Sequence, residues 1–201
     1  MKDRTLILDC KDQVGKKVKI CGWVQTRRDH GKILFLDVLD RSGMIQVVIG
    51  GNKGGDLRAQ DVVCISGQVN KRPEHMVNEN ITTGEIEIAA ENVEILSKAA
   101  ELPFDMGGKD LDLQLPTLLD FRSLTLRHPK VKAIFKVQEV VIDAFREALK
   151  EKDFTEFQAP VIIPQTAEGG AEVFQVKYFE HTAFLAQSPQ FYKQILVPVY
   201  E

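Results

Sequence analysis

Two short segments near the C-terminal end of the chain carry residue types that could hold a small zwitterion. Glu168 precedes Gly169 and Gly170, which would let the backbone approach a ligand closely. Residues 187–193 (QSPQFYK) set two amides, a hydroxyl and an ammonium within seven residues. The carboxylate could bind an amino group, the amides could orient the ligand, and Lys193 could pair with a second carboxylate. These residue types predict a pocket for a small zwitterion that carries two carboxylates.

The composition of the chain is that of a soluble globular protein. Of its 201 residues, 44% are hydrophobic and 27% are charged, which is ordinary for such a domain. No apolar run approaches the roughly 18 residues that span a membrane, and the N-terminal segment MKDRTLILDC lacks a signal-peptide core. We therefore expect a cytoplasmic protein with no membrane partner. The net charge of −3 argues against non-specific nucleic-acid binding but leaves room for a local basic site, such as QTRRDHGK.

The three cysteines are Cys10, Cys21 and Cys64, and they form no C-x-x-C pair. Their wide spacing argues against both a metal site and a disulfide framework. Cys21 and Cys64 lie in apolar alternating runs, so we predict that both are small buried hydrophobic residues.

The first half of the chain is predicted to consist of strands. Charged and apolar residues alternate over residues 17–24, which is the pattern of a half-buried strand. Further strands are predicted over residues 32–40, 44–49, 62–69 and 85–96, with a hairpin at Arg41-Ser42-Gly43 and a candidate short helix within 52–60. Three strands, an insertion and two strands are the layout of an OB-fold, a five-stranded barrel that commonly binds single-stranded nucleic acid. Small sandwiches and SH3-like barrels remain alternatives.

The pattern changes after residue 96. Residues 97–128 show no persistent period and are predicted to be a linker and hinge region, because they are punctuated by Pro103, Gly107, Gly108 and Pro116. Pro129 opens a predicted helix with an apolar stripe on one side. Residues 154–163 are predicted to form a strand, and Pro160 within it must lie at an edge, a bend or an interface.

From about Arg4 to Glu201 the chain resembles the aspartyl-tRNA synthetases of class II. CGWVQTRRDHGKILFLDVLDRSGMIQVVI and RPEHMVNENITTGEIEI resemble the bacterial-type anticodon-binding domain. FRSLTLRHPKVKAIFKVQEVV resembles the hinge and the first catalytic helix, FTEFQAP resembles class II motif 1, and EGGAEVF with KYFEHTAFLAQSPQFYK resembles an archaeal-style amino-acid pocket. The resemblance implies an OB-fold anticodon-binding domain at 1–97, a hinge at 98–128, and the first part of an α+β antiparallel-sheet catalytic domain at 129–201.

The resemblance also implies that the barrel binds a tRNA anticodon. Phe35 corresponds to an aromatic residue that stacks on an anticodon base, which is the usual way to hold splayed RNA. Gln46 corresponds to a polar reader of the anticodon, and Arg28 lies beside the same surface. Without the resemblance, the apolar segment ILFLDV would make Phe35 a core residue, and Gln46 would be an exposed strand residue.

Two histidines bear on which tRNA is charged. His30 stands where a histidine often accompanies family members that charge both tRNA(Asp) and tRNA(Asn). The usual second determinant is a small residue in the RPEG segment, but this chain has His75 there. The resemblance therefore implies relaxed tRNA specificity through His30, and His75 departs from that pattern. Without the resemblance, His30 would be a polar loop residue.

In the pocket, the resemblance implies a site for L-aspartate. Glu168 corresponds to the residue that binds the α-amino group, and Ser188 and Gln190 support that group. Lys193 corresponds to the lysine that pairs with the side-chain carboxylate of aspartate. The neutral side-chain amide of asparagine would leave the Lys193 ammonium unpaired, so this lysine disfavours an asparaginyl relative. Without the resemblance, Glu168 would be a turn residue and Lys193 a solvated lysine.

The implied activity is that of an aspartate–tRNA ligase that uses ATP and Mg²⁺, with a homodimer interface at Pro160. Its chemistry needs positioning and charge neutralisation rather than a side-chain nucleophile, so no catalytic residue is expected. The two ATP-binding motifs of the class are not found in this sequence, and neither is a metal site. We expect the 201 residues alone to bind tRNA weakly and to form no adenylate. The alternatives are a non-catalytic OB-fold tRNA-binding module and an asparaginyl-tRNA synthetase relative.

Overall fold

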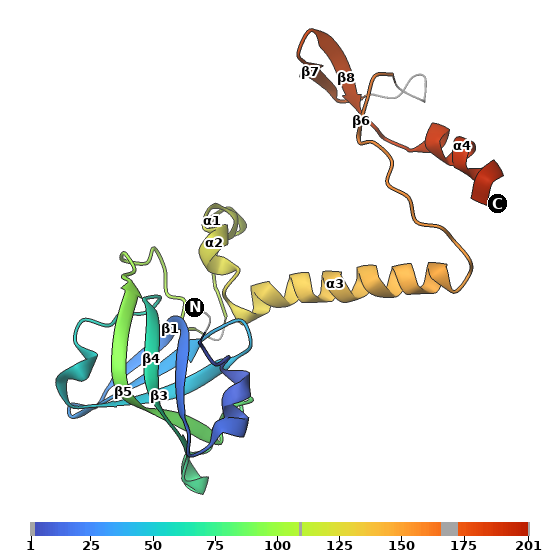
Figure 1. The fold of residues 1–201 in the computed structure, drawn as a ribbon. Coiled ribbons are helices and arrows are strands. Elements are labelled where there is room, and N and C mark those ends of the chain that lie inside the picture. The colour runs from blue at the N-terminus through green and yellow to red at the C-terminus, as the bar shows by residue number, and fades with distance from the viewer. Residues whose placement is uncertain (1–2, 109, 166–172, 201) are drawn as a thin grey trace. The chain divides into compact units, whose positions relative to one another are not determined.

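The structure is a computed structural model that describes residues 3–108, 110–165 and 173–200, without the side chains of residues 52 and 53 (Figure 1). It divides into two compact units, Met1–His128 and Pro129–Glu201.

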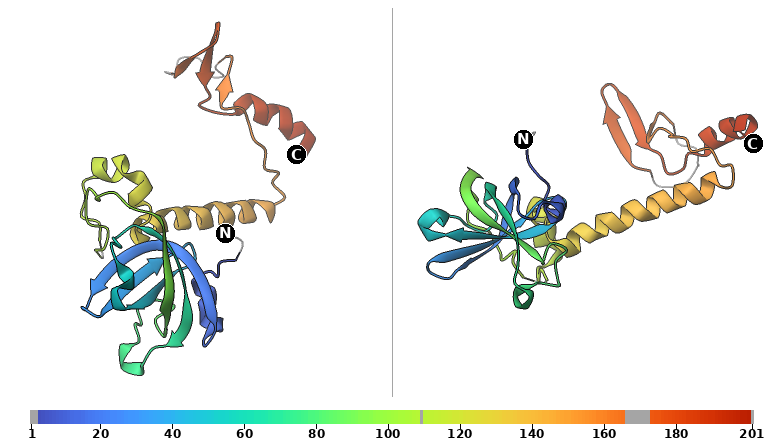
Figure 2. Two further views of the ribbon diagram at one scale, coloured as in Figure 1. Left: turned by 60° about the vertical axis from the view of Figure 1, so that its left-hand side comes forward. Right: turned by 60° about the horizontal axis from the view of Figure 1, so that its bottom comes forward.

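The first unit is a closed five-stranded barrel with the strand order β1-β2-β3-β5-β4 (Figures 1 and 2). Its strands are β1 (Lys17–Asp29), β2 (Ile33–Leu39), β3 (Met44–Gly50), β4 (Val62–Lys71) and β5 (Ile86–Ser97). All neighbours pair antiparallel except β3 and β5, which are parallel. The prediction of an OB-fold is thereby confirmed, and so is each of its five strands.

Alternate side chains of each strand fill the barrel, because successive residues of a strand point to opposite faces. In β2, Leu34, Leu36 and Val38 are buried, whereas Phe35 between them is half-buried. The other strands contribute to the same core in the same way, with Val18, Ile20, Val24, Ile45, Val47, Ile49, Val63, Ile65, Val69, Ile86 and Ile88.

Gly22 lies where β1 passes close to β2. A Cβ at this position would meet the carbonyl oxygen of Leu39, so the backbone would have to move to admit any side chain. The register between β1 and β2 then shifts between Val24 and Thr26, and a shift of this kind bends a strand. Beyond the shift β1 continues to Asp29, well past residue 24, where the alternating pattern predicts its end.

Three 3-10 turns accompany the barrel. η1 (Leu8–Gln13) brings Cys10 into the core next to Ile7. η2 (Gly51–Gly54) lies after β3 and is shorter and earlier than the helix predicted within residues 52–60. η3 (Glu74–Met76) lies in the connection between β4 and β5.

The prediction that Cys21 and Cys64 are buried is confirmed, but the prediction of no disulfide is wrong. The two side chains form a disulfide and are 3% and 4% exposed. They lie directly opposite each other on β1 and β4, with their Cα atoms 4.1 Å apart. Strand register brings them together, and their separation of 43 residues in the sequence does not reveal it.

Residues 98–128 contain two short helices, α1 (Leu115–Asp120) and α2 (Arg122–Thr125), where the sequence pattern indicates only breaks. Pro116 lies in the first turn of α1. Because a proline costs no hydrogen bond there, it begins this helix instead of interrupting one.

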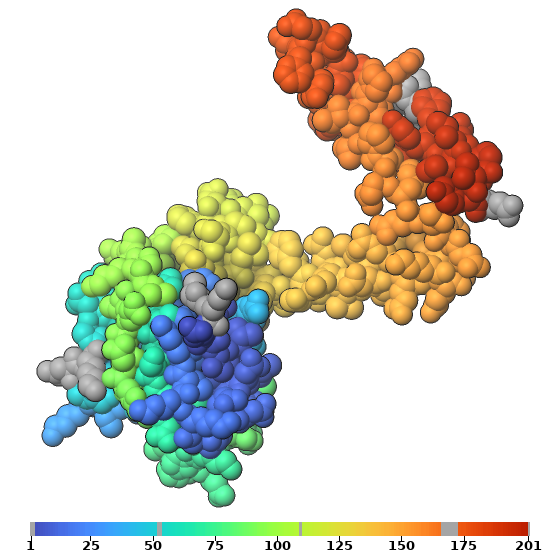
Figure 3. Space-filling model, in the orientation of Figure 1, coloured from blue at the N-terminus to red at the C-terminus, as the bar shows by residue number. Residues whose placement is uncertain are grey.

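The same segment contacts the barrel. The guanidinium of Arg127 lies 5.0 Å from the ring centroid of Trp23, and its Nη1 donates to Oε1 of Gln60 at 3.0 Å. Nε2 of Gln25 donates to the carbonyl oxygen of Met106 at 2.9 Å. In the space-filling view the segment, coloured yellow-green, lies against the strands (Figure 3). Its role as a hinge between domains stays a prediction.

The second unit begins with α3 (Pro129–Lys150), which Pro129 opens as predicted. Its apolar residues recur at helical spacing but remain exposed, with Phe145 at 67% and Ile134 at 59%. A stripe of this kind normally packs against another element. Within the described ranges, no helix has the length and hydropathy required to cross a membrane.

The strand predicted over residues 154–163 is largely absent. Only β6 (Ile162–Ile163) pairs, and it does so with β8 (His181–Leu185). Pro160 lacks the N–H that a strand ladder requires, and the pairing of this segment lies beyond it. A three-stranded antiparallel sheet in the order β6-β8-β7 is completed by β7 (Gln175–Tyr178), and α4 (Gln190–Tyr200) follows.

Candidate nucleic-acid interface and amino-acid site

The outer surface of the barrel carries a row of polar side chains beside an aromatic ring. Thr26, Asp37, Gln46 and Glu87 lie opposite one another across β1, β2, β3 and β5. The neighbouring row pairs Arg28 with Phe35. We call the set formed by Thr26, Arg28, Phe35, Asp37, Gln46 and Glu87 the polar face.

The polar face brings together all three residues predicted to bind an anticodon. Phe35 is half-buried, and therefore its ring is partly open to a ligand, as a stacking residue requires and a core residue does not. Nη2 of Arg28 donates to Oε1 of Gln46 at 3.3 Å. This arrangement sets two hydrogen-bonding side chains beside one partly exposed ring, which suits a single-stranded base.

Carboxylates anchor both Arg28 and Gln46. Arg28 donates from Nη1 and Nη2 to the two oxygens of Asp37, at 2.6 and 3.0 Å. Gln46 donates from Nε2 to Glu87 at 2.9 Å. Bidentate pairs between arginine and a carboxylate fix the plane of the guanidinium. The side chains on this face are therefore held in place before any ligand arrives.

Arg72 lies next to Glu87 of the polar face, with its side chain 4% exposed and its Nε 3.7 Å from the Glu87 carboxylate. Burial lowers the pKa of Arg72, and the charges of Glu87 and Asp37 act in the opposite direction. Two arginines and two carboxylates thus compensate one another at this site.

His30 and His75 lie on the two loops that flank the binding surface of an OB-fold, namely those between β1 and β2 and between β4 and β5. The His30 ring contacts Phe35, with centroids 5.5 Å apart and an interplanar angle of 87°. His75 is exposed within η3. Within the described part of the chain the structure gives no contact between the two histidines.

Reasoning from the sequence missed Thr26, Asp37, Glu87 and Arg72. A signal for two of them was present, because Asp37 follows Phe35 by two residues and Thr26 precedes Arg28 by two. Residues two apart in a strand share a face. Glu87 and Arg72 could not be predicted without the closure of the barrel, which brings β5 beside β3.

The predicted amino-acid site is described only in part. Glu168 lies outside the described residues. Gln190 begins α4, and Lys193 follows three residues later on the same side of the helix. Ser188 is half-buried just before α4, whereas Lys193 is exposed. Ser188, Gln190 and Lys193 therefore lie in or just before the first turn of α4.

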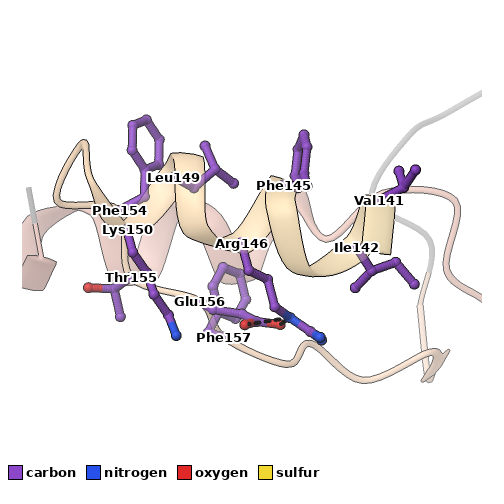
Figure 4. A pocket seen from close by; sticks show the side chains of 10 residues that line it. All are labelled: Val141, Ile142, Phe145, Arg146, Leu149, Lys150, Phe154, Thr155, Glu156 and Phe157. Carbon is purple, nitrogen blue, oxygen red and sulfur yellow. Dashed lines mark hydrogen bonds and ion pairs between the residues drawn. The ribbon is translucent and has the colours of Figure 1, made fainter. Parts of the chain in front are cut away.

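Two hollows in the second unit are largely apolar. One, of about 460 Å³, lies between the C-terminal half of α3 and residues 154–157 (Figure 4). Nε of Arg146 donates there to both carboxylate oxygens of Glu156 at 3.1 Å. The other, of about 630 Å³, includes Lys193 and Lys152. Pro160 is exposed in the described structure.

Two family models match the sequence. Residues 18–96 match the OB-fold nucleic acid binding domain, and residues 114–200 match the class II tRNA synthetases (D, K and N). The chain therefore contains an OB-fold nucleic acid binding domain followed by a class II tRNA synthetase domain (D, K and N).

The curated relatives that the chain matches include aspartate–tRNA ligases. The chain is 38% identical over 209 residues to the aspartate–tRNA(Asp/Asn) ligase of Aeropyrum pernix, covering 98% of this chain and 45% of that protein. It is 42% identical over 192 residues to the aspartate–tRNA(Asp) ligase of Pyrococcus furiosus, covering 91% of this chain and 42% of that protein. It thus spans less than half of the length of either relative.

The solved structures similar to this chain include synthetases. The asparaginyl-tRNA synthetase of Pyrococcus horikoshii, complexed with asparaginyl-adenylate, has a TM-score of 0.83 to this chain at 30% identity. The match covers 100% of this chain and 46% of that structure.

Proposed function

We propose that the protein acts as an aspartate–tRNA ligase, with the polar face of the barrel as its anticodon-binding surface. The observation that carries the proposal is that Arg28, Phe35 and Gln46 share one face, with the ring partly exposed and the polar pair in contact. Proteins hold single-stranded RNA by stacking its bases on aromatic rings and by hydrogen bonds from polar side chains to the base edges.

The amino acid in this proposal is L-aspartate. Lys193 and Gln190 lie on one side of α4 next to Ser188, where a cation and two neutral polar groups could meet a zwitterion. A lysine favours aspartate over asparagine because the amide would leave the ammonium unpaired. We assign the α-amino group to Glu168, which lies outside the described residues.

ATP and Mg²⁺ are the further reactants that this activity requires. Among the described residues no group of three or more His, Cys, Asp or Glu side chains could hold a metal ion, so we assign no residue to it. The partners in the proposal are tRNA(Asp) and, through His30, tRNA(Asn). We also propose a cytoplasmic location and a homodimer with Pro160 at its interface.

The proposal is tested by removing the aromatic ring of Phe35 and measuring RNA binding. We expect Phe35→Ala to weaken binding of an RNA hairpin with the aspartate anticodon by about tenfold, since stacking on one base contributes about 1–3 kcal/mol. Fluorescence anisotropy with the 201-residue chain measures this change.

Phe121→Ala is the matched control. Phe121 is 38% exposed in the first unit, lies outside the polar face, and meets Phe104 edge-on at 5.5 Å. Its loss should leave RNA affinity unchanged. Equal affinities for wild type and Phe35→Ala, or equal losses in both variants, would refute the proposed anticodon surface.

A further inference from the structure

Asp37 holds a central place on the polar face, where it bonds to Arg28 and lies opposite Gln46. Its carboxylate accepts two hydrogen bonds from Arg28, at 2.6 and 3.0 Å, and a third from the Thr26 hydroxyl. The Asp37 side chain is only 13% exposed, whereas that of Arg28 is 45% exposed. A ligand that reaches this face would therefore touch the arginine far more than the carboxylate.

The ion pair between Arg28 and Asp37 determines which N–H groups of Arg28 are already hydrogen-bonded within the protein. A guanidinium has five N–H donors. Two are directed to Asp37 and one to Oε1 of Gln46, at 3.3 Å. Two therefore remain for a ligand, in a plane set by the carboxylate. The Gln46 amide is oriented too, because its Nε2 donates to Glu87 at 2.9 Å.

The same ion pair removes the surplus charge of Arg28. Binding to phosphate depends on uncompensated cations and weakens with salt. Arg28 is compensated by Asp37, and the buried Arg72 lies 3.7 Å from Glu87. A face whose cations are paired and whose donors and acceptors are fixed suits hydrogen bonding to base edges, which carries sequence information, and does not suit phosphate attraction, which carries none.

We infer that Asp37 is a specificity-determining positioning residue, which neutralises Arg28 and holds its guanidinium beside Gln46 so that Arg28 reads a base edge instead of a phosphate. This inference rests on the proposed anticodon surface. It predicts that Asp37 controls the preference for one anticodon over another and the salt dependence of RNA binding.

The test compares dissociation constants for hairpins with the aspartate anticodon and with each anticodon base replaced in turn. We expect Asp37→Asn to reduce the preference for the aspartate anticodon about tenfold, because the loss of one well-placed charge-assisted hydrogen bond costs about that much. Between about 50 and 200 mM salt, the slope of log K against log salt should steepen by about 0.7, as one cation becomes free to meet phosphate.

Glu91→Gln is the matched control. Glu91 pairs with Lys17 at 2.8 Å, both side chains are exposed, and neither belongs to the polar face. The substitution changes the net charge by the same amount as Asp37→Asn. The anticodon preference of this variant should equal that of wild type.

Arg28→Lys separates the effect of the guanidinium's geometry from the effect of its charge. It also tests the inference if Asp37→Asn does not fold. Lysine keeps the charge and the partner of Asp37 but loses the planar fork. We expect the preference to fall with an unchanged salt slope. Retention of the preference in Arg28→Lys, or in folded Asp37→Asn, would overturn the inference alone. A wild-type chain with no preference for the aspartate anticodon would overturn both the proposed function and the inference.

Discussion

The imidazole of His30 meets the ring of Phe35 edge-on, with the two centroids 5.5 Å apart. The backbone N–H of His30 donates to the carbonyl oxygen of Ile33 at 2.9 Å, which ties the histidine to the start of β2. His30 thus supports one edge of the ring that we assign to base stacking. From its place in the sequence alone, His30 is predicted only to be a polar loop residue.

We expect His30→Ala to weaken binding of the aspartate-anticodon hairpin by about threefold, because an edge-to-face pair contributes about 0.5–1.5 kcal/mol. Isothermal titration calorimetry on the 201-residue chain measures the effect. His181→Ala, an exposed histidine of β8, serves as the control and should bind as wild type does. An unchanged affinity in His30→Ala would show that the ring of Phe35 needs no such support.

Period-two alternation was enough to predict the five strands, because each buries every second residue, but it left small sandwiches and SH3-like barrels open as alternatives to the OB-fold. It could not predict register. Asp37 lies beside Arg28, and Cys21 opposite Cys64, only because β1 pairs with both β2 and β4. Pro160 shows another limit, since the apolar composition around it favours a strand that has few pairing partners in the described structure.

The disulfide between Cys21 and Cys64 should stabilise the barrel. We expect reduction to lower the free energy of unfolding by about 3–4 kcal/mol, because the bridge restricts a long loop of the unfolded chain. Urea unfolding with and without dithiothreitol measures the difference. Cys10→Ala should keep this sensitivity to reduction, and Cys64→Ala should lose it. If unreduced, denatured protein reacted with a thiol reagent at all three cysteines, the disulfide would be absent.

Burial raises the pKa of the Cys10 thiol to about 11, and the charges of Asp40 and Asp9 add to the rise. Between the ordinary value of 9.0 and this raised value, the unfolded chain loses a proton that the folded chain retains. The contribution of Cys10 to stability is thus complete below about pH 9 and is lost as the pH rises towards about 11. Urea unfolding across this range should show a steeper loss for wild type than for Cys10→Ala. Parallel pH profiles would contradict the raised pKa.

Gly22→Ala should destabilise the barrel by about 2 kcal/mol, as overpacking against a fixed backbone does. A Cβ there meets the carbonyl oxygen of Leu39, whereas a Cβ at Gly50 has no atom within 4 Å. Gly50→Ala is therefore the control, with an expected change within about 0.5 kcal/mol. Equal midpoints of urea unfolding for the two variants would show that β1 can move away from β2 at low cost.

Photo-crosslinking from the anticodon tests the central claim most directly. A hairpin with the aspartate anticodon would carry a photoreactive base at each anticodon position in turn, and mass spectrometry would locate the crosslinked peptide. The account predicts crosslinks to the segment of β2 that contains Phe35, and fewer crosslinks in Phe35→Ala. Crosslinks confined to Pro129–Glu201, or a yield from the aspartate anticodon no higher than from an unrelated anticodon, would contradict the assignment of the polar face as the anticodon-binding surface.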